Sequence, residues 1–131
     1  MLTPAHKKRL DRELILWLTT VRKDGQPQTL PVWFLVADDQ ILVWSLDGQR
    51  VANLVDNQRV SAHVNDNGRG GEVLSIEGIA AVDSGRGQAV EHPGYVARYQ
   101  PFMDAYDWTW DWFGGRYKVP IVITPTKVRI S

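Results

Sequence analysis

The chain has 131 residues, 44% of them hydrophobic, and its fifteen basic residues balance fifteen acidic ones. This length and hydrophobic content predict a single domain, residues 1–131, and exclude a largely disordered chain. The balanced charge argues against a general nucleic-acid-binding protein, and the lack of cysteine excludes disulfides, thiolate metal sites and a cysteine nucleophile.

The first half of the chain predicts one helix followed by several strands. Thr3 and Pro4 are suitable as the N-cap and first residue of a helix that ends near Arg12. Four strand-like runs follow it, at residues 14–21, 28–36, 41–46 and 59–64. The dipeptide Asp24-Gly25 predicts a hairpin turn between the first two runs, and residues 37–40 predict the next turn. A short amphipathic helix, residues 49–57, precedes the fourth run.

The second half begins with a polar, glycine-rich loop, residues 65–71, and a long strand, residues 72–82. Gly78 is a suitable position for a bulge in that strand. Residues 87–99 favour a helix that Pro93 kinks or splits.

The remaining segments are, in order, a partly helical aromatic stretch at 100–116 and two strands at 117–124 and 126–130, separated by Pro125. Within the aromatic stretch, a helix would place Trp108 and Trp112 on one face and Trp110 on another. We expect these rings to pack against the sheet or a partner subunit. The alternative is an aromatic lid over a planar ring or a substrate.

Apolar residues occupy both faces of the second and third predicted strands. Leu30 and Val32 alternate with Pro31 and Trp33, and the run 41–46 shows the same pattern. Burial on both sides is expected where a sheet is covered on both sides. Because few helices are predicted, we expect a small, filled barrel whose outer wall packs against a second copy in a homodimer.

Arg50 is the candidate binding residue that the pattern itself indicates. It lies in the first turn of the short helix, where free backbone N–H groups and the helix dipole favour an anion. A phosphate held there would lie at the rim of the barrel, which suggests a phosphorylated cofactor. The alternative is an exposed Arg50 that pairs with Asp47 or Asp56 and contributes little.

Several motifs occur in a fixed order along nearly the whole chain. They are Pro31-Val32-Trp33-Phe34, Arg50-x-x-Asn53-Leu54, Asn57-Gln58-Arg59-Val60, Gly68-Arg69-Gly70-Gly71-Glu72-Val73 before Glu77-Gly78, and Tyr117-Lys118-Val119-Pro120-Ile121 before Thr124-Pro125-Thr126-Lys127-Val128-Arg129. With them the chain resembles the split β-barrel flavin and deazaflavin proteins related to pyridoxamine 5′-phosphate oxidase. Within that family it is most similar to the F420-dependent oxidoreductases.

The resemblance implies a mainly β fold with a few short helices, a split β-barrel of the FMN-binding type with about six to seven antiparallel strands. It also implies a homodimer with cofactor sites at the interface. The cofactor-binding residues that it implies are Gln28, Pro31, Val32, Trp33, Ser45, Arg50 and Asn53. The family usually has lysine where this chain has Arg50, and arginine keeps the charge and can bind phosphate through two parallel hydrogen bonds.

Arg69 is a further candidate, which would reach a cofactor tail across the dimer. The glycines around it are better explained by a hairpin loop that needs positive φ angles than by a phosphate-binding loop.

The function that the resemblance implies is hydride transfer from reduced coenzyme F420 to a small conjugated or electron-poor molecule. An FMN-binding oxidoreductase on the same scaffold is the first alternative, and a non-catalytic carrier of flavin, haem or a similar planar ligand is the second. No catalytic residue is assigned, and the proton that follows the hydride would come from water or from Tyr117.

Other classes of function find no support in the sequence. His6, His63 and His92 lack the spacing of metal ligands, and no serine lies in a Gly-x-Ser-x-Gly motif. The longest apolar runs are too short to span a bilayer, and residues 1–11 do not resemble a secretion signal. We therefore expect a cytoplasmic protein without a metal ion.

Overall fold

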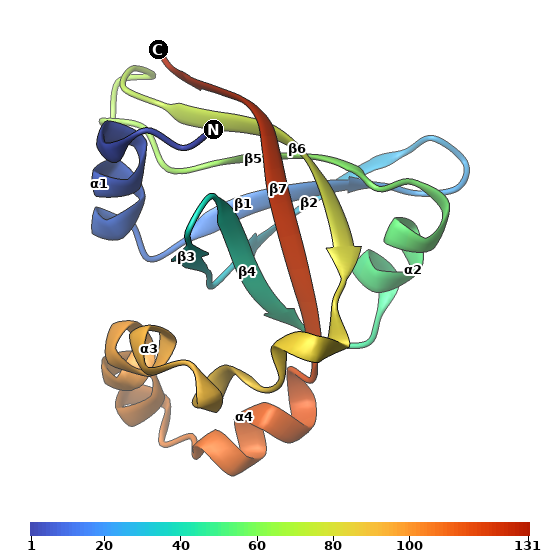
Figure 1. Cartoon of the computed structure of the whole chain (residues 1–131), viewed down its shortest axis with the longest axis vertical. Coiled ribbons are helices and arrows are strands. Elements are labelled where there is room, and N and C mark those ends of the chain that lie inside the picture. The colour runs from blue at the N-terminus through green and yellow to red at the C-terminus, as the bar shows by residue number, and fades with distance from the viewer.

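The computed structural model describes residues 1–131 and shows seven antiparallel strands in one curled sheet, with helices at its ends (Figure 1). The strands are β1 (Leu16–Val21), β2 (Pro27–Val32), β3 (Leu35–Ala37), β4 (Gln40–Ser45), β5 (Arg59–His63), β6 (Leu74–Val82) and β7 (Val119–Ile130). The helices are α1 (Pro4–Arg12), α2 (Gln49–Asp56), α3 (Pro93–Tyr106), α4 (Trp110–Arg116) and the 3₁₀ turns η1 (Ser84–Arg86) and η2 (Ala89–Glu91). The strand order is β2-β1-β5-β6-β7-β4-β3. The predicted fold, a split β-barrel of the mainly β class, is confirmed.

The N-terminal signals act as the sequence predicts. Thr3 caps α1 by accepting the His6 N–H at 3.1 Å, and the His6 ring accepts the Thr3 N–H at 3.2 Å. Gly25 adopts a φ of 90° in the hairpin turn that joins β1 and β2.

The second predicted strand, residues 28–36, is divided in the structure. β2 ends at Val32, and β3 begins at Leu35. Between them the Phe34 N–H donates to the hydroxyl of Tyr99 at 2.8 Å. The same hydroxyl donates to the Leu14 carbonyl oxygen, also at 2.8 Å. A side chain from α3 therefore takes the place of a neighbouring strand at this point.

The two predicted C-terminal strands are one continuous strand, β7, so the predicted break at Pro125 is wrong. Glu77 pairs with Lys127 and Gly78 pairs with Pro125, which leaves Thr126 as an extra residue. Pro125 is tolerated because it lies beside this bulge. Gly78 marks the irregularity as predicted, and a Cβ there would lie 2.8 Å from the Thr124 carbonyl oxygen.

The helix predicted over residues 87–99 begins only at Pro93. The preceding residues form η1 and η2, and α3 continues beyond Tyr99 to Tyr106. Proline fits the first helical position because its missing N–H would have no intrahelical partner there. The predicted segment is thus split, and Pro93 starts the α-helix that follows the two 3₁₀ turns.

Two apolar clusters hold the fold together. The larger one fills the inside of the curled sheet, with fully buried residues such as Leu18, Val43 and Ile121. The second lies outside β4 and β7, where Leu42 and Trp44 pack with residues of α3 and α4. Figure 1 shows α3 and α4 side by side at one end of the sheet, and we call them the helical lobe.

The helical lobe corrects one expectation. The outer face of β4 is covered by this chain's own helices, so its two-sided apolar pattern needs no partner subunit. β2 differs, because Leu30 is 58% exposed and Pro31 is also exposed. None of the helices is both long and apolar enough to cross a membrane.

Candidate functional site

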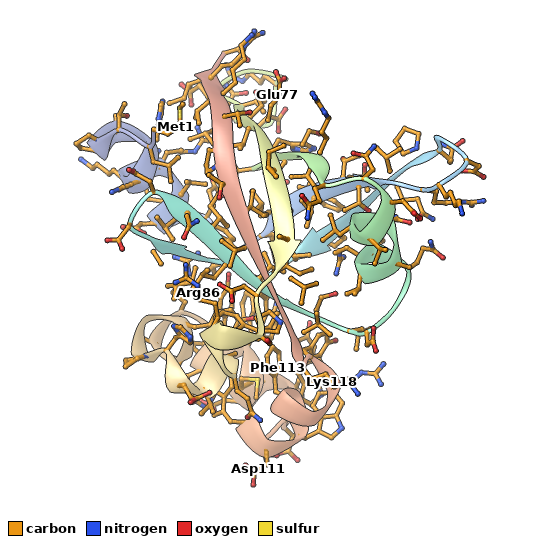
Figure 2. The ribbon with its side chains drawn as sticks, turned by 45° about the vertical axis from the view of Figure 1, so that its right-hand side comes forward. Met1, Glu77, Arg86, Asp111, Phe113 and Lys118 are labelled. Atoms are coloured by element: carbon orange, nitrogen blue, oxygen red, sulfur yellow. The ribbon has the colours of Figure 1, made fainter.

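An aromatic cavity of about 230 Å³ lies where the helical lobe meets the sheet. Its walls come from β2, β4, α2, α3, α4 and the segments beside them, and Arg50 is their only charged residue. The aromatic wall residues include Trp33, Trp44, Tyr95, Trp108, Phe113 and Tyr117. Figure 2 shows Phe113 at this junction and Asp111 at the outer end of the lobe. The site is thus a largely apolar, aromatic cavity with one cation among its wall residues.

Trp33 forms a rigid part of the wall. Its ring stacks on Tyr99 with centroids 4.7 Å apart and planes inclined by 3°, and it is parallel within 8° to Phe113 at 5.6 Å. Trp33 and Phe34 form the break between β2, which ends at Val32, and β3, and the Trp33 ring packs against residues of the helical lobe. Pro31 and Val32 also line the cavity, as their predicted role requires.

Arg50 is half-buried and has no carboxylate partner. Its guanidinium donates to the Ser45 hydroxyl at 3.0 Å, and neither Asp47 nor Asp56 forms an ion pair with it. Burial lowers the pKa of Arg50 because the charged form loses hydration. The exposed, paired arginine considered in the sequence analysis is therefore not what the structure contains.

The start of α2 adds to the anion-binding character around Arg50. Its N-cap is Gly48, which has no side chain to accept the first N–H groups of the helix. Those groups carry the positive end of the helix dipole. A negatively charged group at this point would meet both the helix end and the guanidinium.

Asn53 and Gln28 hold α2 against the sheet. The Asn53 amide donates to the Thr20 hydroxyl at 2.8 Å and to the Gln28 side-chain oxygen at 3.0 Å. Its own oxygen accepts from Gln49 at 2.8 Å. Both amide hydrogens of the buried Asn53 are thus used inside the protein, and they fix the position from which Arg50 extends.

Arg69 lies apart from the other predicted residues. Its loop is at the end of the sheet opposite the helical lobe (Figure 1). The four loop N–H groups of residues 68–71 donate to the side chains of Asp66 and Asn67. The hairpin-loop interpretation of this glycine-rich segment accounts for its geometry.

The three tryptophans near the C-terminus have different positions. Trp110 packs in the second apolar cluster, and its indole N–H donates to Gln100 at 2.8 Å. Trp108 lines the cavity and stacks on Tyr106 with centroids 4.6 Å apart. Trp112 contacts Trp108 but remains 43% exposed. The segment therefore combines packing with a contribution to the cavity wall through Trp108.

Tyr95 was not predicted from the sequence, and its side chain is fully buried and lines the cavity. The available signal was its spacing from Tyr99 and Met103, four and eight residues later, which places all three on one helix face. That pattern was divided by the predicted boundary, because the helix was expected to end at Tyr99 and Met103 fell in the next segment.

The curled antiparallel sheet and the aromatic cavity define a split-barrel protein, a fold that binds flavin-type cofactors. The sequence profile described as Pyridoxamine 5′-phosphate oxidase matches residues 2–129, and the chain belongs to that family. The family predicted from the motifs is thereby confirmed. A search among curated proteins finds no significant match.

Solved structures support this assignment. An F420 reductase is 26% identical, with 94% of each chain covered and a TM-score of 0.66. An FAD-binding protein from Mesorhizobium loti is 21% identical, covering 92% of this chain and 85% of the other, with a TM-score of 0.62. The haem storage protein HutZ from Vibrio cholerae is 16% identical, covering 98% and 94%, with a TM-score of 0.65. The latter two show the shared fold alone.

Proposed function

We propose that the protein is an oxidoreductase that binds a phosphorylated redox coenzyme, F420 in the first place and FMN as the alternative. Its substrate would be a small conjugated or electron-poor molecule. The observation that carries this proposal is Arg50, a half-buried cation without a carboxylate partner at the edge of an aromatic cavity. Such a cation has lost hydration and gains most from an anionic ligand.

The residues present fit such a coenzyme. Arg50, with Ser45 and the uncapped start of α2, would bind the phosphate. Pro31, Val32 and Trp33 would support the ring system, while Gln28 and Asn53 keep α2 in position. When bound, the coenzyme supplies hydride-transfer chemistry, and the apolar walls exclude water from the reacting atoms.

F420 is preferred to FMN because the F420 reductase covers 94% of both chains at 26% identity. The phosphate contact would be similar for the two coenzymes, which keeps FMN as the alternative. About 230 Å³ is small beside the roughly 300–1,000 Å³ of pockets for drug-sized ligands. A ring-sized portion of ligand fits within this cavity, and the rest of a coenzyme would extend past Arg50.

The second candidate is a non-catalytic carrier of a flavin-type ligand. The cavity wall contains no carboxylate and no histidine, so binding is possible without a protein acid or base. The lack of a wall histidine disfavours haem, because an imidazole is a common ligand of haem iron. A carrier would bind the planar ligand tightly and transfer no hydride.

We also propose a cytoplasmic homodimer with the coenzyme sites near the subunit interface. The exposed apolar residues of β2 support a partner at this edge of the sheet, next to the cavity residues Pro31 and Val32. Arg69 would then reach a coenzyme only from the partner subunit. A chain without cysteine suits a reducing compartment.

The test of this function is titration of the purified protein with F420 and with FMN, with tryptophan fluorescence as the binding signal. Arg50→Glu should weaken binding at least roughly tenfold, because a phosphate would then face a carboxylate in a partly desolvated site. Arg12→Glu is the matched control, since Arg12 is an exposed residue of α1 without an ion pair, and should bind as the wild type does. Unchanged dissociation constants for Arg50→Glu would contradict the phosphate role.

Catalysis is tested separately by following the oxidation of reduced F420 in the presence of conjugated ketones, quinones and nitroaromatic compounds. Turnover with any of these acceptors supports the oxidoreductase. Tight coenzyme binding without turnover would instead favour the carrier.

A further inference from the structure

The hydroxyl oxygen of Tyr95 is the one buried side-chain nitrogen or oxygen atom in the structure without a hydrogen-bond partner. Tyr95 lies in α3 and has no exposed surface, yet it is part of the cavity wall. Because no group of the chain reaches this hydroxyl, the cavity is the place from which a partner can come.

Tyr99 provides the comparison within the same helix. It lies four residues further along α3, with its ring centroid 4.8 Å from that of Tyr95. Its hydroxyl accepts the Phe34 N–H and lies within bonding distance of the Leu14 carbonyl oxygen. Of two adjacent buried tyrosines, one hydroxyl is satisfied by the protein, and the other has no partner although its residue lines the cavity.

A free, buried hydroxyl is unfavourable for the protein alone. Phenylalanine would contribute the same ring packing against Trp44 and Phe113 without desolvating an unpaired polar group. Burial also raises the pKa of Tyr95 well above its ordinary value, so the group stays protonated and remains a donor. A ligand that pairs with it must therefore present an acceptor atom.

We infer that the Tyr95 hydroxyl donates a hydrogen bond to a carbonyl oxygen of a planar, conjugated ligand in the aromatic cavity. The ligand class is a ring-sized ketone or quinone, flat enough for the aromatic walls and small enough for about 230 Å³. Tyr95 is then the residue that distinguishes an oxygen-bearing ring from a hydrocarbon of the same shape.

For catalysis, which rests on the proposed function, the same bond has a second effect. Addition of hydride to the conjugated ring leaves negative charge on the carbonyl oxygen, and the Tyr95 hydrogen bond stabilises that charge. A proton from water completes the reduction, while the reduced coenzyme is oxidised by loss of the hydride.

The test compares two probes with the same bicyclic skeleton, 1,4-naphthoquinone and naphthalene, without any coenzyme. Binding is followed by calorimetry and by fluorescence of the tryptophans in the cavity wall. Tyr95→Phe should weaken naphthoquinone binding roughly three- to tenfold, the effect of one lost neutral hydrogen bond, and leave naphthalene binding equal or stronger. The chain has no cysteine, so the quinone forms no thiol adduct.

Tyr99→Phe is the matched control. It removes a hydroxyl that the protein uses, so it should lower the melting temperature while the ratio of the two probe affinities stays as in the wild type. Tyr95→Phe should keep or raise the melting temperature, because no internal bond is lost. A purely structural hydroxyl would give the opposite order of stabilities.

Equal affinities of Tyr95→Phe and the wild type for naphthoquinone would overturn the inference, as would a wild type that binds no naphthoquinone. Neither result depends on F420 or FMN. If Arg50→Glu leaves coenzyme binding unchanged while Tyr95→Phe weakens the quinone alone, the proposed coenzyme fails and the role of Tyr95 stands.

Discussion

Arg50 shows how one residue can be unfavourable for folding and still suit a binding site. A guanidinium removed from water usually gains a carboxylate in exchange, and Arg50 gains only the neutral hydroxyl of Ser45. The lowered pKa of Arg50 has the same cause, the loss of hydration on burial. An incoming anion would compensate for this loss. Removal of the Arg50 charge should therefore raise the stability of the ligand-free protein and weaken its binding of an anionic ligand.

We therefore expect Arg50→Met to stabilise the ligand-free protein by on the order of 1 kcal/mol, because an apolar side chain replaces a half-buried, unpaired charge. The same variant should lose most of the added stability that F420 or FMN gives the wild type. Urea unfolding with and without coenzyme measures both quantities. A ligand-free variant less stable than the wild type would show that Arg50 supports the fold.

At the scale of elements, the loop between β5 and β6 is organised by one carboxylate. Asp66 accepts the N–H groups of Gly68 at 3.0 Å and Gly70 at 2.6 Å, and both glycines have positive φ angles. These bonds hold the pKa of Asp66 below its ordinary value of 3.8. Because the carboxylate already occupies the loop amides, the loop presents no free cradle for a phosphate.

A group whose pKa is lower in the folded state stabilises that state above the unfolded pKa, and the effect is lost as the pH falls through the folded value. We expect the loop amides of Gly68 and Gly70 to lose protection from hydrogen exchange below about pH 4. Asp66→Asn should remove this pH dependence, since an amide does not titrate. Equal acid sensitivity of the two proteins would assign the transition to another carboxylate.

The elements that could be predicted from the sequence are those with local causes. The cap of α1, the turn at Asp24-Gly25 and the bulge at Gly78 each depend on a few neighbouring residues. The break at Phe34 and the continuity through Pro125 depend on contacts with distant parts of the chain. No local pattern contains that information.

The candidate site likewise contains residues that the sequence could predict and one that only the structure shows. Pro31, Val32, Trp33 and Arg50 were recognised from motifs, and all four line one cavity. The free hydroxyl of Tyr95 could not be recognised, because a missing partner is visible only when every neighbouring group has been placed.

At the scale of the whole molecule, the coverage of the sheet is uneven. The helical lobe covers the outside of β4 and β7, whereas β2 lies at the edge with Leu30 exposed. Pro27 and Pro31 in this strand have no N–H group to offer a further strand. A second copy would therefore associate through side-chain packing and not by extending the sheet.

The proposed homodimer predicts a mass of twice 14.9 kDa by light scattering after gel filtration. Leu30→Lys should shift the protein toward the monomer, because a charge would replace an apolar side chain in the packed contact. It should also weaken coenzyme binding if the sites lie at the interface. A wild type that remains monomeric at high concentration would exclude this arrangement.

The bonds of Tyr99 also determine how a small molecule can enter and leave. They tie α3 to the chain at Phe34 and Leu14, so we expect no rigid-body movement of this helix away from the sheet. We expect a small molecule to pass the more accessible residues of the cavity wall, such as Tyr106, which is 59% exposed. We expect ordinary side-chain rotation, on the picosecond to nanosecond scale for exposed residues, to govern this passage and not a slow domain movement.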